Sequence, residues 1–421
     1  MLPALILFTL TYALMLTFGK YRTWIALGSA LLFIVTGMLP AGEILKSVDY
    51  NVLLMIAGTM GLVALFIDSK MPELLADMIM EKVPNVMWAA VSLSLFAGVI
   101  SAFVDNVATV LMIAPVALEI CKKLKTNPVP FIIGIAVSSN LQGAATLVGD
   151  TTAIMLGSAL DMSFTDFFWY LGKPSIFFAV ELGAVLAACI LAWLFRKEKG
   201  AIPKSPRTKV TDFVPTVLLA GTVVLLMAAS FLPDKPATTN GLICCGLLAI
   251  GLIYNVSRKK TLKAVIGPLK EIDFNTIGLL IGLFLVIGGI KARGVIDAAA
   301  AMLAKTGGGN VFVLYTVIVW ASVGISAFID NIPYVATMIP VIAGLAEALG
   351  VDPTPLYFGL LSGATLGGNI TPIGASANIT AIGLLRRQGY DVSSRDFMRI
   401  GVPFTLAAVM TGYLFCWFVW Q

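Results

Sequence analysis

Long apolar runs separated by short polar stretches follow one another along the whole chain. A helix needs about 20 apolar residues to cross a bilayer, and a helix satisfies its own backbone hydrogen bonds where no water is present. The sequence therefore predicts an all-α polytopic membrane protein. We place about ten transmembrane helices near 2–18, 23–38, 51–67, 128–160, 174–195, 213–231, 240–256, 275–290, 355–385 and 402–420.

Four apolar runs are not simple spans. The runs 86–120 and 311–348 are too long for one crossing, and each carries an Asp-Asn pair near its middle. We interpret both as re-entrant hairpins that enter and leave the membrane on the same side. The runs 128–160 and 355–385 contain glycine and polar residues at their centres, which predicts two interrupted helices. Irregular backbone at this depth must be buried in protein or line a watery cavity.

The distribution of Lys and Arg supports this topology. The loops predicted on one side hold 22 of the 28 basic residues, and the opposite loops hold 6. The positive-inside rule places the basic side in the cytoplasm, so both termini are predicted outside it. We expect the protein in the cell inner (plasma) membrane. Since the basic residues lie in short loops beside spans, they do not indicate a nucleic-acid partner.

Matching segments occur in both halves of the chain. Ile100–Asn106 (ISAFVDN) matches Ile325–Asn331 (ISAFIDN), and Val48–Asn51 matches Ile272–Asn275, at offsets of 225 and 224 residues. With the charge-based topology the copies run in opposite directions, as alternating-access transporters commonly do. We predict two inverted repeats, at about 48–195 within the N-terminal half 1–195 and about 272–421 within the C-terminal half 213–421, joined by a cytoplasmic linker at 196–212.

Polar residues concentrate at the predicted hairpin tips and helix interruptions. Gly and Pro break helices and free backbone groups, while Asn, Thr and Ser both donate and accept hydrogen bonds. Half-helix ends add partial charges that can face a solute or an ion. The candidate substrate-binding residues are Asn106, Thr109, Gly143, Thr146, Gly149, Asn331, Gly368, Asn369, Thr371, Pro372, Ser376 and Asn378.

Carboxylates inside the predicted membrane segments are the candidates for proton or cation coupling. A charged side chain at the bilayer centre costs at least about 2.5 kcal/mol, so Asp105, Asp330 and Asp150 are expected to be functional. The repeat counterpart of Asp150 is Ala375, and Glu181 has no repeat partner. The chain has no histidine, so proton chemistry must use carboxylates. Its five cysteines lack metal-type spacing, and no metal site is predicted.

At four motifs the chain resembles a known transporter superfamily. They are SAFVDNVATVLMIAPV (101–116), GAATLVGD (143–150), SAFIDNIPYVATMIPV (326–341) and GGNITPIGASANI (367–379). They resemble the ion-transporter superfamily of arsenite permeases, NhaD-type sodium/proton antiporters, the melanosomal P protein and divalent-anion/sodium symporters. The aspartate before each tip asparagine is most similar to the arsenite-permease and P-protein branch. The resemblance implies a scaffold domain that can dimerise and a transport domain that holds the hairpins and broken helices.

Two departures from the superfamily stand out. The divalent-anion symporters usually have Ser-Asn-Thr at the tip, whereas this chain has Asp-Asn-Val and Asp-Asn-Ile. Relatives often have Pro-Pro-Asn after the Gly-Asp of the first interruption, whereas this chain has Thr151-Thr152-Ala153. Asn378 therefore has no amide counterpart in the first repeat, because Ala153 occupies that position.

We predict a secondary active transporter rather than an enzyme. The leading hypothesis is proton-coupled efflux of arsenite or antimonite, since neutral arsenite is a small hydrogen-bonding solute that suits weak oxygen and amide contacts. Sodium/proton antiport and inorganic or organic anion transport are the alternatives. An intramembrane aspartyl protease is a remote one, because its Gly-x-Gly-Asp motif is replaced by Leu147-Val148-Gly149-Asp150.

No cofactor is expected, because the proton motive force, or a sodium gradient, would drive transport. The predicted partners are a small inorganic solute and the lipid bilayer. A homodimer and a soluble ATPase partner are left open by the sequence.

Overall fold

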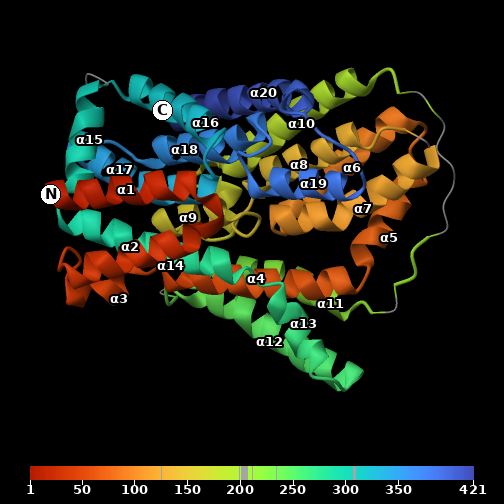
Figure 1. Ribbon diagram of the computed structural model, residues 1–421, viewed down its shortest axis with the longest axis horizontal. Coiled ribbons are helices and arrows are strands. Elements are labelled where there is room, and N and C mark those ends of the chain that lie inside the picture. The colour runs from red at the N-terminus through yellow and green to blue at the C-terminus, as the bar shows by residue number, and fades with distance from the viewer. Residues whose placement is uncertain (125, 199, 201–206, 211, 234, 307–309) are drawn as a thin grey trace.

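The computed structural model describes residues 1–421 except 125, 199, 201–206, 211, 234 and 307–309, and the described chain is almost entirely helical (Figure 1). The one pair of strands among these residues, β1 (Trp169–Tyr170) and β2 (Lys173–Pro174), forms a short antiparallel hairpin. The predicted all-α fold class is confirmed.

The helices follow the same order in the two halves. The first half contains α1 (Leu2–Thr17), α2 (Arg22–Val35), α3 (Ile44–Ser47), α4 (Tyr50–Asp68), α5 (Met71–Met80), α6 (Val86–Ser101), α7 (Asn106–Leu124), α8 (Val129–Gly143), α9 (Thr151–Ala159) and α10 (Ile176–Phe195). The second contains α11 (Val214–Ser230), α12 (Thr239–Lys259), α13 (Lys263–Lys270), α14 (Phe274–Ala292), α15 (Val295–Thr306), α16 (Val311–Ser326), α17 (Asn331–Leu349), α18 (Thr354–Gly367), α19 (Ser376–Arg387) and α20 (Ser394–Trp420).

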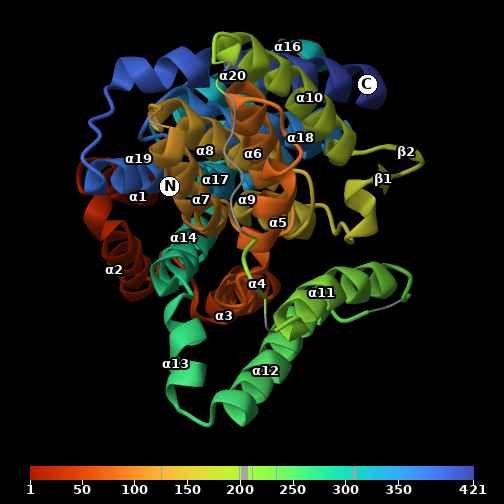
Figure 2. The same ribbon diagram turned by 90° about the vertical axis from the view of Figure 1, so that its right-hand side faces the viewer.

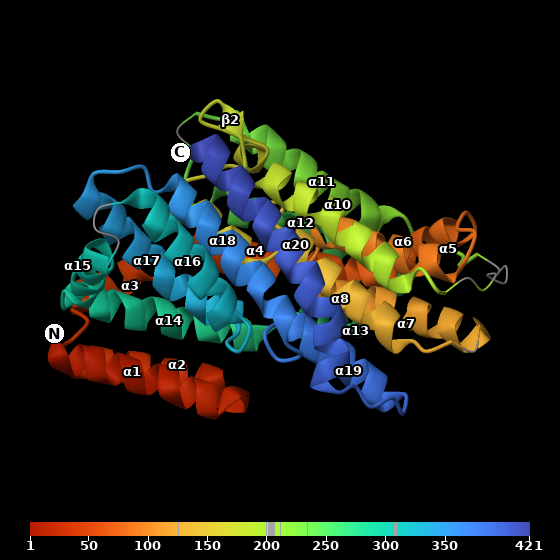
Figure 3. The ribbon, with the colours of Figure 1, turned by 90° about the horizontal axis from the view of Figure 1, so that it is seen from above.

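Both long Asp-Asn runs are broken at the pair itself. Residues 102–105 separate α6 from α7, and residues 327–330 separate α16 from α17. The expected interruptions are also present, at 144–150 between α8 and α9 and at 368–375 between α18 and α19, where a 3-10 turn (Gly368–Ile370) follows α18. Figures 1 and 3 show α6–α7 and α16–α17 at opposite ends of the long axis, as two inverted copies would be. Their orientation in the membrane stays a prediction.

Helix length separates full crossings from partial ones. Among the described residues, six helical segments are long and apolar enough to cross a membrane alone: 41–68, α10, α12, α14, α17 and α20. The apolar helices α6, α8, α11 and α16 are shorter. Helices α1 and α2, predicted as two separate spans, form a pair bent by 115°. With 16 and 14 residues they measure about 24 and 21 Å, less than the roughly 30 Å hydrocarbon core.

Several stretches expected to be loops are helical. Helices α5, α13 and α15 lie within 68–85, 257–274 and 291–310, where too few consecutive apolar residues occur to indicate a span. Helix α20 begins eight residues before its predicted start at 402, because Ser393 and Asp396 form a capping box there.

The linker predicted at 196–212 is only partly within the described chain, since 199, 201–206 and 211 lie outside it. Near its C-terminal end, Arg207 pairs with Glu81 at 2.5 Å, and Thr208 donates to Asp77 through its backbone N–H at 2.8 Å. These contacts place that part of the linker along α5.

The helices fall into two groups in space. Figure 2 shows α11, α12 and α13 standing away from the bundle that contains α16, α18 and α20, with α4 between them. Helix α12 packs along α4, and α2 packs along α14. At both contacts a glycine permits close approach, since a Cβ on Gly58 would meet Cys244 and a Cβ on Gly282 would meet Ala26. The structural correspondence therefore includes α2 and α12, which precede the repeats found in the sequence.

Two glycines fasten the hairpin tips to the interrupted helices. A Cβ on Gly149 would lie 2.5 Å from the carbonyl oxygen of Gly143 and 2.7 Å from that of Ser101. A Cβ on Gly374 would lie 2.6 Å from the Gly368 oxygen and 2.8 Å from the Ser326 oxygen. The repeated Thr-x-x-Gly motifs are thus required by backbone packing in both halves.

We predict that Gly149→Ala and Gly374→Ala each destabilise the protein by about 1–3 kcal/mol, because the new methyl group would overlap backbone oxygens. Thermal unfolding in detergent micelles would show a lower Tm for both. Gly324→Ala is the matched control, since a Cβ there meets nothing within 4 Å. An unchanged Tm for Gly149→Ala and Gly374→Ala would contradict this packing.

Candidate functional site

A cluster of buried amides joins the two halves at the helix breaks. Asn106, the first residue of α7, donates to the side-chain oxygen of Asn140 on α8 at 2.9 Å. The Asn140 amide donates in turn to Asn369 at 2.8 Å and to Asn378 at 3.0 Å. Asn140 is 1% exposed. The interrupted helices of both halves therefore meet through one side chain.

The same cluster satisfies backbone carbonyls that the helix breaks leave open. Asn369 donates to the Val137 oxygen at 3.0 Å. Asn378 donates to the oxygens of Gly368 at 2.9 Å and Thr371 at 3.1 Å. An unsatisfied carbonyl at membrane depth costs several kcal/mol, so these amide donors stabilise the break in which they lie.

Hydroxyl groups hold each hairpin tip in equivalent ways. Thr146 donates to the carbonyl oxygen of Ala102, and Thr371 donates to that of Ala327. Ser139 also donates to the Asn106 oxygen at 3.0 Å. The repeated threonines are therefore engaged in attaching the tips.

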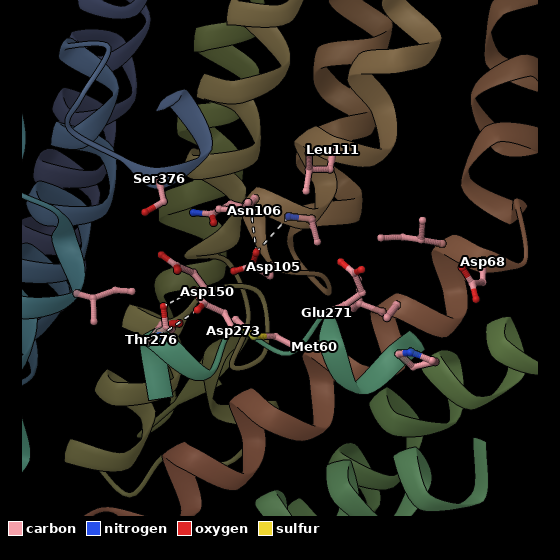
Figure 4. A pocket seen from close by; sticks show the side chains of 18 of the residues that line it. Met60, Asp68, Asp105, Asn106, Leu111, Asp150, Glu271, Asp273, Thr276 and Ser376 are labelled. Atoms are coloured by element: carbon pink, nitrogen blue, oxygen red, sulfur yellow. Dashed lines mark hydrogen bonds between the residues drawn. The ribbon is translucent and has the colours of Figure 1, made fainter. Parts of the chain in front are cut away.

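A cavity of about 410 Å³ lies beside this cluster (Figure 4). It brings together five predicted site residues: Asp105, Asn106, Asp150, Asn331 and Ser376. Three further carboxylates line it, those of Asp68, Glu271 and Asp273. No Lys or Arg is among the described residues that line this cavity. A cleft lined by one sign of charge concentrates counter-ions, so the cavity favours cations and neutral hydrogen-bonding solutes over free anions.

The two carboxylates nearest the helix breaks are differently held. Asp105 accepts the backbone N–H groups of Val107 at 3.0 Å and Ala108 at 3.2 Å, at the start of α7. Asp150 is 4% exposed and accepts the Thr152 hydroxyl at 2.7 Å. The Asn331 amide lies 3.4 Å from the same Asp150 oxygen. Asp150 therefore links the first interruption to the tip of the second hairpin.

The second tip aspartate, Asp330, lines a neighbouring cavity of about 580 Å³. Its Oδ2 atom is 2.5 Å from the Arg22 guanidinium and accepts the Ser376 hydroxyl at 2.9 Å. Asp273 and Ser376 line both cavities. The sequence-equivalent tip residues Asp105 and Asp330 thus have different electrostatic environments.

The other predicted site residues support these cavities without lining them. They are Thr109, Gly143, Thr146, Gly149, Gly368, Asn369, Thr371, Pro372 and Asn378. Glu181 on α10 accepts the Gln142 amide at 3.3 Å and lines neither cavity.

Sequence reasoning missed Asp273 and Arg22. The repeated Asp49 and Asp273 motif was a usable signal, because both carboxylates cap the N-terminus of the equivalent helices α4 and α14. Arg22 served only as a topology marker.

In the part of the chain that the structure describes, no three or more Cys, Asp or Glu side chains gather in a way that would hold a metal ion. All five cysteines are free thiols, and none is among the residues that line the two cavities.

Broken helices, paired hairpins and a polar central cavity define a membrane transporter. The chain matches the CitMHS family, described as citrate transporters, over residues 12–361 and 247–421. It belongs to that family, which confirms the resemblance to the ion-transporter superfamily.

Relatives cover nearly the full chain. An uncharacterized transporter of Mycobacterium tuberculosis is 30% identical, covering 98% of this chain and 97% of its own length. The 46 kDa membrane protein of Mycobacterium leprae is 28% identical over the same shares. The human P protein is 25% identical, covering 88% of this chain and 53% of that protein.

Two solved transporter structures share the fold. The YdaH transporter of Alcanivorax borkumensis has a TM-score of 0.64 at 14% identity and covers 92% of this chain and 88% of that one. MtrF of Neisseria gonorrhoeae, from a class of antimetabolite efflux pumps, has a TM-score of 0.60 at 15% identity and covers 92% and 84%.

We predict that Asn140→Ala lowers both Tm and transport, because it leaves amide groups of Asn106, Asn369 and Asn378 without their partner. Each buried polar group left unsatisfied costs about 1–3 kcal/mol. Asn255→Ala is the control: Asn255 is also buried, donates to the Ala264 oxygen at 2.7 Å and lies outside both cavities. It should lower Tm while preserving transport per folded molecule. A parental Tm for Asn140→Ala would contradict the role of the amide cluster.

Proposed function

We propose that this chain is a proton-coupled secondary transporter that works by alternating access and exports a small hydroxylated solute, with arsenite and antimonite as the first candidates. The observation that carries the proposal is the cavity in which the Asp105 and Asp150 carboxylates lie with the Asn106 and Asn331 amides, lined by no described basic residue. Amides can bind the solute while a carboxylate exchanges the proton.

The chemistry of arsenite suits such a lining. At neutral pH it is mostly an uncharged trihydroxide, so it needs no cationic side chain. Its hydroxyl groups can donate to an ionised carboxylate and accept from an amide N–H. The absence of cysteine among the residues lining the cavity favours turnover, since a soft thiolate would hold a metalloid tightly.

Proton exchange at Asp105 would couple the solute to the gradient. Ionised Asp105 can accept a hydrogen bond from the solute, and protonated Asp105 loses that capacity. Solute binding and proton binding are therefore mutually opposed at this residue. Asp150 supports the coupling, because its charge adjoins the same cavity and its hydrogen bonds fix the neighbouring Asn331 amide.

The cavity rim suggests the direction of loading. Asp68, Pro268 and Glu271 line the cavity and belong to stretches predicted as cytoplasmic. With both termini outside the cytoplasm, this state would take up solute from the cytoplasm, which suits export.

Sodium/proton antiport is the second candidate. The cavity is lined by five carboxylates, those of Asp68, Asp105, Asp150, Glu271 and Asp273. Carboxylate and amide oxygens are ligands for hard cations, so a sodium ion could occupy the place that we assign to the solute.

Anion transport has support from the family description, which names citrate. The acidic lining opposes a free tricarboxylate, but a complex of citrate with a divalent cation would carry less negative charge. Citrate with and without Mg²⁺ therefore belongs among the solutes to be tested. Membership of a transporter family favours all of these functions over the intramembrane protease alternative.

The test is solute uptake into everted vesicles under an imposed pH gradient, comparing arsenite, antimonite, sodium, citrate and citrate with Mg²⁺. We expect gradient-driven uptake of arsenite and antimonite. Asp105→Asn should reduce it at least tenfold (about 1.4 kcal/mol), since the amide cannot exchange a proton. Asp297→Asn, an exposed aspartate on α15, should retain it. Uptake of sodium or magnesium citrate alone would replace the proposed solute, and undiminished coupled uptake by Asp105→Asn would refute the proton role.

A further inference from the structure

An arginine from outside the hairpins reaches the tip of the second hairpin. Arg22 is the first residue of α2, and its Nη1 atom is 2.5 Å from Oδ2 of Asp330. The Arg22 and Asp330 side chains are 30% and 14% exposed, so water screens the pair only partly. Helix α2 packs along α14. The ion pair therefore joins the α2–α14 pair of helices to the hairpin formed by α16 and α17.

The packing of α2 and α12 identifies the residue equivalent to Arg22. Gly58 and Gly282 occupy matching positions in α4 and α14, 224 residues apart. Gly58 faces Cys244, and Gly282 faces Ala26, which makes Ala26 and Cys244 equivalent. The same register aligns Phe33, beside Gly289, with Gly251, beside Leu65. Four residues before Ala26 and Cys244 lie Arg22 and Asn240. The second copy thus has a neutral amide where the first has a guanidinium.

The tip aspartates differ accordingly. Asp105 accepts only backbone N–H groups of its own helix among the hydrogen bonds formed within the described chain, and no described Lys or Arg pairs with it. Asp330 has the Arg22 guanidinium and the Ser376 hydroxyl on one oxygen. An arginine side chain keeps its proton under all ordinary conditions in proteins, so the charge beside Asp330 is permanent.

We propose that Arg22 is a built-in counter-ion that takes, at the second hairpin, the place that a proton or transported cation takes beside Asp105 at the first. Asp330 remains ionised and paired, and Asp105 is the tip carboxylate left to exchange its counter-ion during transport. Arg22 is thus a positioning residue that sets the coupling of the site. This inference rests on the proposed function only in its transport consequence, because the pairing itself is independent of the solute.

The proposal makes a specific demand on paired substitutions. Arg22→Gln alone leaves Asp330 without its counter-ion, and Asp330→Asn alone leaves a guanidinium uncompensated. Removing one member of a partly buried pair is far more harmful than replacing both by neutral groups. Each single substitution should therefore reduce transport at least tenfold, a loss of about 1.4 kcal/mol, and the double substitution Arg22→Gln/Asp330→Asn should recover much of it.

The experiment compares these variants in everted vesicles, with gradient dependence of arsenite uptake as the coupling readout. The double variant should transport within about threefold (0.65 kcal/mol) of the parent and keep the parental ratio of protons to solute, because the neutralised pair exchanged no proton. Arg22→Lys should recover part of the activity, and Lys20→Gln, an exposed basic residue in the same turn, should match the parent. Arg22→Gln combined with Asp105→Asn should stay inactive, which shows that recovery belongs to the Arg22 pair.

A folded double variant that is inactive, or that transports without coupling to protons, would overturn the proposal, since Asp330 would then be an exchanging carboxylate. Thermal unfolding separates this from a wrong solute. If the parent moves none of the tested solutes, the proposed function fails, while a lower Tm for each single variant and recovery in the double still support the pairing. No recovery of Tm in the double variant would contradict it.

Discussion

A helix that breaks inside a membrane leaves carbonyl and N–H groups without partners, and lipid supplies none. In this protein the two breaks lie against each other, and Asn140, Asn369 and Asn378 provide the missing hydrogen bonds across and within them. This satisfaction of the broken backbone is the interaction on which the rest depends. It fixes the half-helix ends, and the half-helix ends fix the hairpin tips through Thr146 and Thr371. The acidic cavity lies where these elements meet.

The breaks and their contents could be predicted from sequence, because glycine and charged residues inside apolar runs are conspicuous. Asp105, Asp150, Asn106 and Asn331 were found this way, and all four line the cavity. The roles within the site could not be separated. Nothing in the letters distinguishes an asparagine that lines the cavity from Asn378, which holds the Gly368 and Thr371 carbonyls.

Features that depend on distant packing were beyond the sequence. Any apolar residue suits a lipid-facing helix, so α2 and α12 share structural positions without a shared motif. Short helices such as α5 and α15 have too few apolar residues to resemble spans, and their sequences looked like loops. Arg22 and Asp330 are 308 residues apart in sequence, and only the packing of α2 on α14 brings them together.

Duplication has produced a frame with two matching halves and a site with unequal ones. The frame repeats the hairpins, the breaks and the packing glycines. The site has Asp150 opposite Ala375, Asn378 opposite Ala153, and Arg22 opposite Asn240. A symmetric frame suits exchange between two similar states, whereas an asymmetric site gives one hairpin the exchangeable charge. That division of roles fits a transporter that couples one solute to one ion.

The central claim is that the cavity beside Asp105 is the transport site. The direct measurement is the reaction of a membrane-impermeant thiol reagent with a single cysteine at Ala108, which lines the cavity, in a variant lacking the five native cysteines. Ser257→Cys, exposed at the end of α12 and outside the cavity, is the reference position. We predict that the transported solute slows labelling of Ala108→Cys and leaves the reference unchanged. Labelling of Ala108→Cys that no tested solute affects, although the same variant transports one of them, would contradict the account.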